Sequence, residues 1–393
     1  MPDQAPSSPM RPLRYNSNVR HCVIAEAQLY NPMCTTPPFT ATCCIKPLHP
    51  FSTSIPPQAQ GDAGIAPLPH RQLISLSGPD AAKFLQGLIT HNVDPELHSS
   101  FYSAFLDARG RVLWDVFIWA WPELAAKEGH WACYIEVDEG EVDALKKHLK
   151  KHKLRSKIKI AHVEDEGEGG TRVWASWGLA DRTLHTNAII ADLDDPRAPS
   201  LRRYLARADG EIKADGVESI DAKAYQLQRY KYGIPEGPQE ILRESALPME
   251  CNVDLSQGID FKKGCYVGQE LTIRTKHTGV VRKRMLPVQL RSSTASYNFP
   301  EYGADIKQLD ENGCIKKGRA AGKLIAGIGD VGLALCRLEM MTSMKISAEG
   351  GSWRPGMEFG IENNGEIIKV KPVLYDWFVL RERELWDKNR TRI

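Results

Sequence analysis

The feature that most constrains this chain is an octapeptide with two glycines, Lys263-Gly264-Cys265-Tyr266-Val267-Gly268-Gln269-Glu270. Glycine adopts positive φ readily and permits a close approach, so the pair indicates a tight turn. A thiol on such a turn can face solvent, and nearby positive charge favours its thiolate. Four cations are close in the sequence: Lys262, Lys263, Arg274 and Lys276. The alternative is that Cys265 is a small buried residue, as free cysteines commonly are.

The octapeptide resembles the signature of the YgfZ-type folate-binding-fold proteins, whose mitochondrial branch consists of iron–sulfur cluster assembly factors. Shorter fragments extend the resemblance from about Leu73 to Tyr375: Phe84-Leu85-Gln86-Gly87 with Thr90, Asp107-Ala108-Arg109-Gly110-Arg111, Asp195-Pro196-Arg197, Arg229, Gly233, Pro235, Leu247-Pro248, Glu250, Asn252 and Asp254. The resemblance implies an α+β, folate-binding aminomethyltransferase-like fold, with two mixed α/β subdomains and a small C-terminal all-β barrel. It also implies work with A-type scaffold proteins in the maturation of [4Fe–4S] proteins in the mitochondrial matrix.

Composition narrows the possible partners. The chain has 393 residues and a net charge of +2, without a basic run interleaved with aromatic residues, so we expect no nucleic-acid partner. No apolar stretch approaches the eighteen or so residues of a membrane span, so we expect none. The nine cysteines include no Cys-x-x-Cys pair, which fits a reducing compartment and indicates no complete metal site of the chain's own.

The chain divides into three parts by pattern. Residues 1–68 are rich in proline and poor in acidic residues, which predicts a disordered segment with a mitochondrial presequence, or only a proline-rich tail. Residues 69–284 mix strands with single helices and end in the octapeptide, which predicts an α+β region. Residues 285–393 show short strands and turns, including the hairpin signal Asn364-Gly365, and predict a β-barrel-like domain.

The chemistry predicted for the octapeptide centres on Cys265. An iron–sulfur cluster normally needs four protein ligands, so this one thiolate would share a cluster with a partner. Lys263 could pair with the charge of the cluster or with a folate carboxylate, and Gln269 and Glu270 could orient neighbours or simply hold the turn. The lysines of residues 146–151 predict a solvated helix face, or a surface for an acidic partner.

A tetrahydrofolate pocket is the basis of a second hypothesis, a folate-dependent aminomethyltransferase. Folate needs an aromatic or apolar slot for its pterin and cations for its glutamate. The residues expected to ring this cavity are Lys263, Arg109, Arg111, Arg229 and Tyr225. One-carbon transfer does not require a thiol at the centre of a signature, so Cys265 favours the assembly factor. A thiol redox enzyme would need Cys251 as resolving partner, although a core position is favoured for that cysteine.

Overall fold

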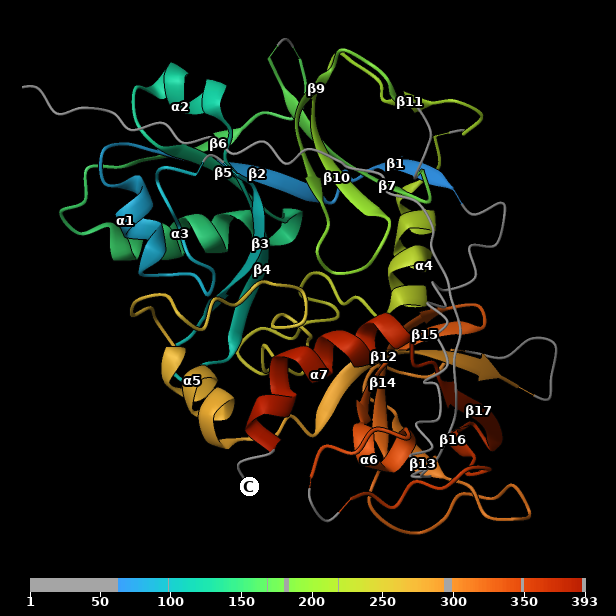
Figure 1. Ribbon diagram of the computed structural model, residues 1–393. Coiled ribbons are helices and arrows are strands. Elements are labelled where there is room, and N and C mark those ends of the chain that lie inside the picture. Colours follow the sequence, from blue (N-terminus) through green and yellow to red (C-terminus); the bar gives the residue numbers. More distant parts are fainter. Residues whose placement is uncertain are drawn as a thin grey trace, which may run out of the picture. The chain divides into compact units, whose positions relative to one another are not determined.

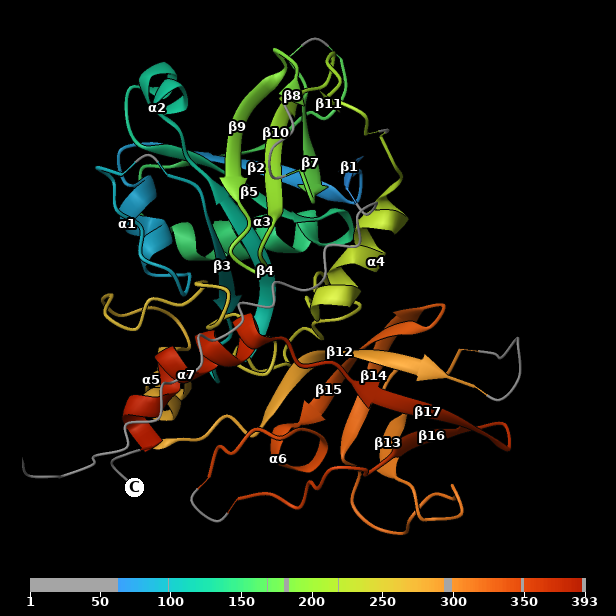
Figure 2. The same cartoon turned by 45° about the vertical axis from the view of Figure 1, so that its right-hand side comes forward.

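A computed structural model describes residues 63–97, 99–167, 169–179, 184–217, 219–292, 299–347 and 350–390 (Figures 1 and 2). Most of the predicted N-terminal segment, and with it the presequence, lies outside the described residues. Its expected end at residue 68 is wrong, because Gly64–Pro67 forms strand β1. Ile65 and Ala66 are fully buried in this strand, which pairs antiparallel with β7 (Thr171–Trp177).

The first sheet has five antiparallel strands in the order β3-β4-β5-β2-β6. Its strands are β2 (Arg71–Ser77), β3 (Phe101–Leu106), β4 (Val112–Trp119), β5 (Ala132–Asp138) and β6 (Lys159–Val163). The associated helices are α1 (Ala81–Gln86), α2 (Pro122–Glu128), the 3₁₀ turn Glu139–Glu141 and α3 (Val142–Lys153). Because Val142, Leu145 and Leu149 recur at helical spacing, α3 buries one face in the same core as the sheet and leaves its lysines outside.

The second sheet has the order β1-β7-β10-β9, beside the short pair β8-β11. The remaining bounds are β8 (Leu184–His185), β9 (Ile189–Asp194), β10 (Leu201–Arg207) and β11 (Lys213–Ala214). Helix α4 (Ala222–Tyr232) follows and has clear end signals. The Asp221 side chain accepts a hydrogen bond from the Ala224 N–H at its start, and Gly233 ends it in the left-handed region at φ +73°.

The C-terminal strands close into a barrel, β12-β15-β14-β13-β16-β17, reached through α5 (Gln269–Thr278). The barrel strands are β12 (Lys283–Arg291), β13 (Asp305–Gln308), β14 (Gly322–Ile328), β15 (Val331–Arg337), β16 (Phe359–Asn363) and β17 (Glu366–Pro372), with α6 (Leu338–Met341) after β15. Asn364 and Gly365 both have positive φ between β16 and β17, as the hairpin signal predicts.

Helix α7 (Asp376–Arg390) leaves the barrel and returns to α5 (Figure 1). Trp386 packs edge-on against Phe261 at 6.4 Å between ring centroids and donates to an Asp254 carboxylate oxygen at 2.9 Å. The mixed α/β architecture with a closed C-terminal barrel confirms the predicted fold class. In the part of the chain that the structure describes, no helix has both the length and the apolar character to span a membrane.

Candidate functional site

The octapeptide forms a turn that leads directly into α5, and its residues divide between outward and inward positions. Cys265 is an exposed free thiol, which contradicts the core alternative. Gly264 beside it is also exposed, and a Cβ added there would meet no atom within 4 Å. The fold therefore does not require glycine at this position, and the backbone next to the thiol is open to an approaching molecule.

The side chain of Lys263 turns inward and binds the end of helix α1. Its ammonium donates three hydrogen bonds, to the carbonyl oxygens of Gln86 at 2.8 Å, Ile89 at 2.7 Å and His91 at 2.8 Å. Burial lowers the pKa of Lys263 to about 8, with Asp260 acting in the opposite direction. An ammonium has three N–H donors, and all three are used here. Lys263 is thus a clamp within the chain, which corrects the expectation that it faces a cluster or a folate carboxylate.

The other inward residues of the octapeptide hold the same turn. Tyr266 is buried, its ring lies 4.9 Å from the Lys263 ammonium, and its N–H donates to the Gln269 side-chain oxygen at 3.2 Å. Gly268 has φ +80°, and a Cβ there would lie 2.3 Å from the Asp107 carbonyl oxygen. This position needs glycine for both reasons. Glu270 in the first turn of α5 is exposed and takes no part in this packing.

The loop between β3 and β4 packs directly against the octapeptide. Gly110 has φ +78°, and a Cβ added to it would lie 3.0 Å from the Gly268 carbonyl oxygen. Asp107 organises the loop by accepting from the backbone N–H groups of Arg109 and Arg111 at 2.8 and 2.9 Å. The side chain of Arg109 is 69% exposed and forms an ion pair with Asp107 at 2.8 Å, and Arg111 donates to the Ser245 carbonyl oxygen at 2.8 Å. Of the predicted folate residues, Arg109 and Arg111 therefore lie on a loop that contacts the octapeptide.

Arg229 and Tyr225 belong to a different, buried set of contacts. Arg229 forms a two-pronged ion pair with Glu240, at 2.7 and 3.1 Å. Burial alone would lower the pKa of Arg229, but the carboxylates of Glu240 and Glu236 raise it instead. The Tyr225 hydroxyl donates to Glu236 at 2.9 Å and accepts from Arg203 at 2.6 Å. The prediction that all five folate-binding side chains surround one cavity is therefore wrong. Buried carboxylates already neutralise the charge of Arg229 and accept from Tyr225.

Cys251 is placed in the core, as the favoured interpretation had it. It is 3% exposed, and burial raises the pKa of its thiol. A thiol held neutral in an apolar site is a poor nucleophile and a poor metal ligand. The other exposed free thiol among the described residues is Cys314. Within these residues no group of three or more His, Cys, Asp or Glu side chains is placed to hold a metal ion.

The comparisons with known proteins decide the family. The family model for the CAF17 C-terminal β-barrel domain matches residues 282–378. A protein of Phaeosphaeria nodorum named iron–sulfur cluster assembly factor IBA57 homolog, mitochondrial, is 56% identical over 338 residues, which cover 83% of each chain. A protein of the same name from Coccidioides immitis is 44% identical, over 82% of this chain and 84% of its own. The chain belongs to the IBA57 family of iron–sulfur cluster assembly factors.

The solved structures agree on the fold. The crystal structure of the glycine cleavage system aminomethyltransferase T from Bartonella henselae matches with a TM-score of 0.55 at 16% identity, over 81% of this chain and 87% of that one. At this identity the likeness shows the fold alone. The resemblance read from the octapeptide, an assembly factor on an aminomethyltransferase-like fold, is confirmed.

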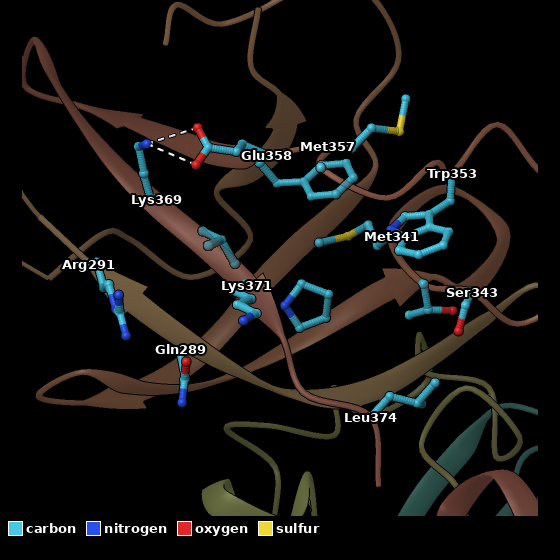
Figure 3. A pocket seen from close by; sticks show the side chains of 15 residues that line it. Gln289, Arg291, Met341, Ser343, Trp353, Met357, Glu358, Lys369, Lys371 and Leu374 are labelled. Atoms are coloured by element: carbon cyan, nitrogen blue, oxygen red, sulfur yellow. Dashed lines mark hydrogen bonds and ion pairs between the residues drawn. The ribbon is translucent and has the colours of Figure 1, made fainter. Parts of the chain in front are cut away.

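Among the described residues of this IBA57-family chain, Cys265 lines none of four cavities, although one of about 440 Å³ lies beside helix α5, which begins at the end of the octapeptide. A cavity of about 600 Å³ opens on the barrel, where Met341 and Trp353 form an apolar side and the Lys369–Glu358 ion pair lies opposite (Figure 3). A second cavity, of about 460 Å³, lies beside Arg229. No residue of the octapeptide lines either one. The exposed turn, rather than a cavity, is therefore the candidate site of cluster chemistry.

One neighbour of the clamp was not foreseen from the sequence. His91 follows the fragment that ends at Thr90, and its ring stacks on Phe101 at 4.4 Å while its Nδ1 lies 2.8 Å from the Asn92 carbonyl oxygen. Burial lowers the pKa of His91, which favours the neutral imidazole. The sequence offered one signal, the position of His91 directly after the fragment that ends at Thr90. Sequence alone does not show that the His91 carbonyl oxygen accepts a hydrogen bond from Lys263.

Proposed function

We propose that this assembly factor holds an iron–sulfur cluster together with an A-type scaffold protein, with Cys265 as its own ligand, during maturation of [4Fe–4S] proteins in the mitochondrial matrix. The observation that carries the proposal is the exposed Cys265 thiol beside the open backbone of Gly264. One thiolate is a quarter of a usual cluster ligand set, so the remaining ligands come from the partner. The mitochondrial setting is supported by the names of the relatives.

The rigid frame under Cys265 supports the same proposal. Lys263, two residues before Cys265, donates hydrogen bonds to three carbonyl oxygens, and Gly268 packs closely against the loop that contains Asp107. A ligand mounted between two anchored points loses little conformational freedom when it binds.

The decisive experiment compares the two exposed thiols. The full chain is mixed anaerobically with an A-type scaffold carrying a [2Fe–2S] cluster, and the cluster is followed by visible absorption, circular dichroism and EPR. We expect wild type and Cys314→Ser to form a shared or converted cluster and Cys265→Ser to form none. All three proteins should unfold at the same temperature, because both thiols are exposed. An unchanged cluster signal with Cys265→Ser refutes the proposal.

The aminomethyltransferase-like fold supports a second candidate, weak tetrahydrofolate binding beside Arg229. The cavity there contains Arg229 and Lys223, but also the carboxylates of Asp138, Glu236 and Glu240. These carboxylates disfavour the anionic glutamate of folate, so we expect weak binding by calorimetry. Lys223→Glu is the better test variant, because Arg229 is needed for a buried ion pair. No heat of binding at millimolar tetrahydrofolate would exclude the transferase and leave the assembly function intact.

A further inference from the structure

The segment that contains α3 and the following loop is far more basic than the rest of the chain. Residues 144–163 contain no Asp or Glu and eight cations: Lys146, Lys147, Lys150, Lys151, Lys153, Arg155, Lys157 and Lys159. The whole chain, by contrast, has a net charge of only +2. Among the described residues, Lys146 is the one member whose side chain forms an ion pair, with Asp143 at 3.8 Å. We call these eight residues together with Leu154 the α3 basic surface.

The geometry of α3 places three of these lysines on one exposed side of the helix. Lys147, Lys150, Lys151 and Leu154 recur at helical spacing and are all exposed, whereas Leu145 and Leu149 pack into the core on the other side. Figures 1 and 2 show one end of α3 next to α1. There a hollow of about 640 Å³ is lined by Asp80, Lys83, Phe84, Leu154, Arg155 and Ser156. The surface thus combines a basic stripe with a hollow whose lining includes the apolar side chains of Phe84 and Leu154.

The exposure and backbone conformation of Leu154 are a second observation, independent of the charges. It is 88% exposed, more than any other large apolar residue described. Its backbone has φ +43° and ψ −111°, a conformation that strains a bulky residue. The other described non-glycine residues with positive φ are all polar: Ser200, Glu244, Asn252, Gln257 and Asn364. The chain therefore keeps an apolar side chain in water, on strained backbone, at the centre of its most basic segment. Folding alone gives no reason for this arrangement.

We propose that the α3 basic surface docks on an anionic phospholipid membrane, with the lysines at the headgroups and Leu154 inserted among them. Seven of the eight cations are lysine. Lysine is depleted at protein–protein interfaces, where arginine is enriched, but it is attracted to anionic headgroups. The segment contains no Phe, Tyr or Trp, which single-stranded nucleic acids require for stacking. Binding at a membrane interface grows with the apolar area inserted and with the attraction of basic residues to anionic lipids; here Leu154 offers the first and the lysines the second.

Vesicle co-sedimentation of the full chain tests the proposal. We expect binding to equimolar phosphatidylcholine–phosphatidylglycerol vesicles that weakens with added salt, and little binding to phosphatidylcholine alone. The double variant Lys150→Gln/Lys151→Gln should bind roughly 25-fold more weakly, since each cation near an anionic surface contributes about fivefold. The matched control Lys316→Gln/Lys317→Gln removes the same charge from an exposed loop elsewhere and should change little.

Leu154→Gly separates insertion from charge attraction. Glycine accepts this backbone without strain, so the melting temperature should not fall, whereas vesicle binding should drop by about fivefold or more. Equal binding to both vesicle types, or equal loss in the two lysine double variants, would overturn the proposal. So would full vesicle binding by Leu154→Gly together with tight binding of wild type to soluble polyglutamate. That pattern would assign the surface to an acidic protein instead.

Discussion

The substitution Lys263→Met tests whether this lysine is a structural clamp. It keeps the length of the side chain but removes three N–H donors from the carbonyl oxygens of Gln86, Ile89 and His91. A hydrogen bond from a charged donor contributes ~1.5–3 kcal/mol, so the three together have an upper limit of about 9 kcal/mol. Burial of the ammonium opposes this gain, as its lowered pKa of about 8 shows. We therefore expect a net loss of about 2–3 kcal/mol, close to the cost of leaving one or two carbonyls without a donor.

Thermal and urea unfolding measure this loss, with Lys262→Met as the matched control. Lys262 is exposed, and only its backbone N–H is hydrogen-bonded, to Asp260 at 2.8 Å. The control should unfold with wild type, whereas Lys263→Met should melt roughly 3–5 °C lower, because the melting temperature of a chain of this size shifts little per kcal/mol. Amide exchange should accelerate at residues 86–93 in particular, because the clamp joins that segment to the octapeptide.

A result in the opposite direction would refute this argument. If Lys263→Met were as stable as wild type and exchanged no faster at residues 86–93, the three hydrogen bonds would contribute nothing measurable. If the variant also failed to form the shared cluster while fully folded, Lys263 would act on the cluster or on the partner, as first predicted from the sequence. Loss of cluster formation in proportion to loss of folded protein would agree with the clamp.

The glycines of the octapeptide and the buried carboxylate of Glu236 are open to similar tests. Gly268→Ala should lower the free energy of unfolding by roughly 1–3 kcal/mol, because φ is +80° and the new Cβ would lie 2.3 Å from the Asp107 carbonyl oxygen. Gly264→Ala should leave the free energy of unfolding unchanged and affect only cluster transfer. Equal stability of the two variants would contradict the packing described. Burial raises the pKa of Glu236, but Arg203 and other arginines overcome this and hold it well below 4.5. Its stabilising contribution is therefore complete above pH 4.5 and is lost as the pH falls further, so the stability difference between wild type and Glu236→Gln should shrink in acid; a difference that grows there would show the sign to be wrong.

Local signals explain which elements could be predicted. The hairpin at Asn364-Gly365 was predicted because both residues favour positive φ, and the ends of helix α4 carry equally local signals, since Asp221 and Gly233 act within one turn. Strand β1 was missed, since its four residues are surrounded by prolines and are held by β7, more than a hundred residues later. Helix α7 was also missed, because its place depends on contacts with Phe261 and Asp254 rather than on its own pattern.

The same distinction applies to the site. Cys265 was identified because its glycine-rich surroundings are a local property, and the structure exposes it. The folate ring was wrong as a group because sequence shows where cations occur but not which carboxylates fold back onto them. Arg229 forms an ion pair with Glu240, eleven residues later, beyond the end of α4. This ion pair neutralises the charge that was predicted to bind a ligand.

These contacts give the octapeptide two kinds of residue. Lys263, Tyr266 and Gly268 are explained by the fold, because each has an intramolecular contact that requires its chemistry. Gly264 and Cys265 are not explained in this way, because nothing in the described chain touches the space beside the glycine and the thiol faces outward. A rigid turn that presents a single thiol cannot assemble a cluster site by closing on itself. Under the proposed function, the ligands that complete the site therefore come from another protein, and the open backbone at Gly264 leaves room for it to approach the thiol.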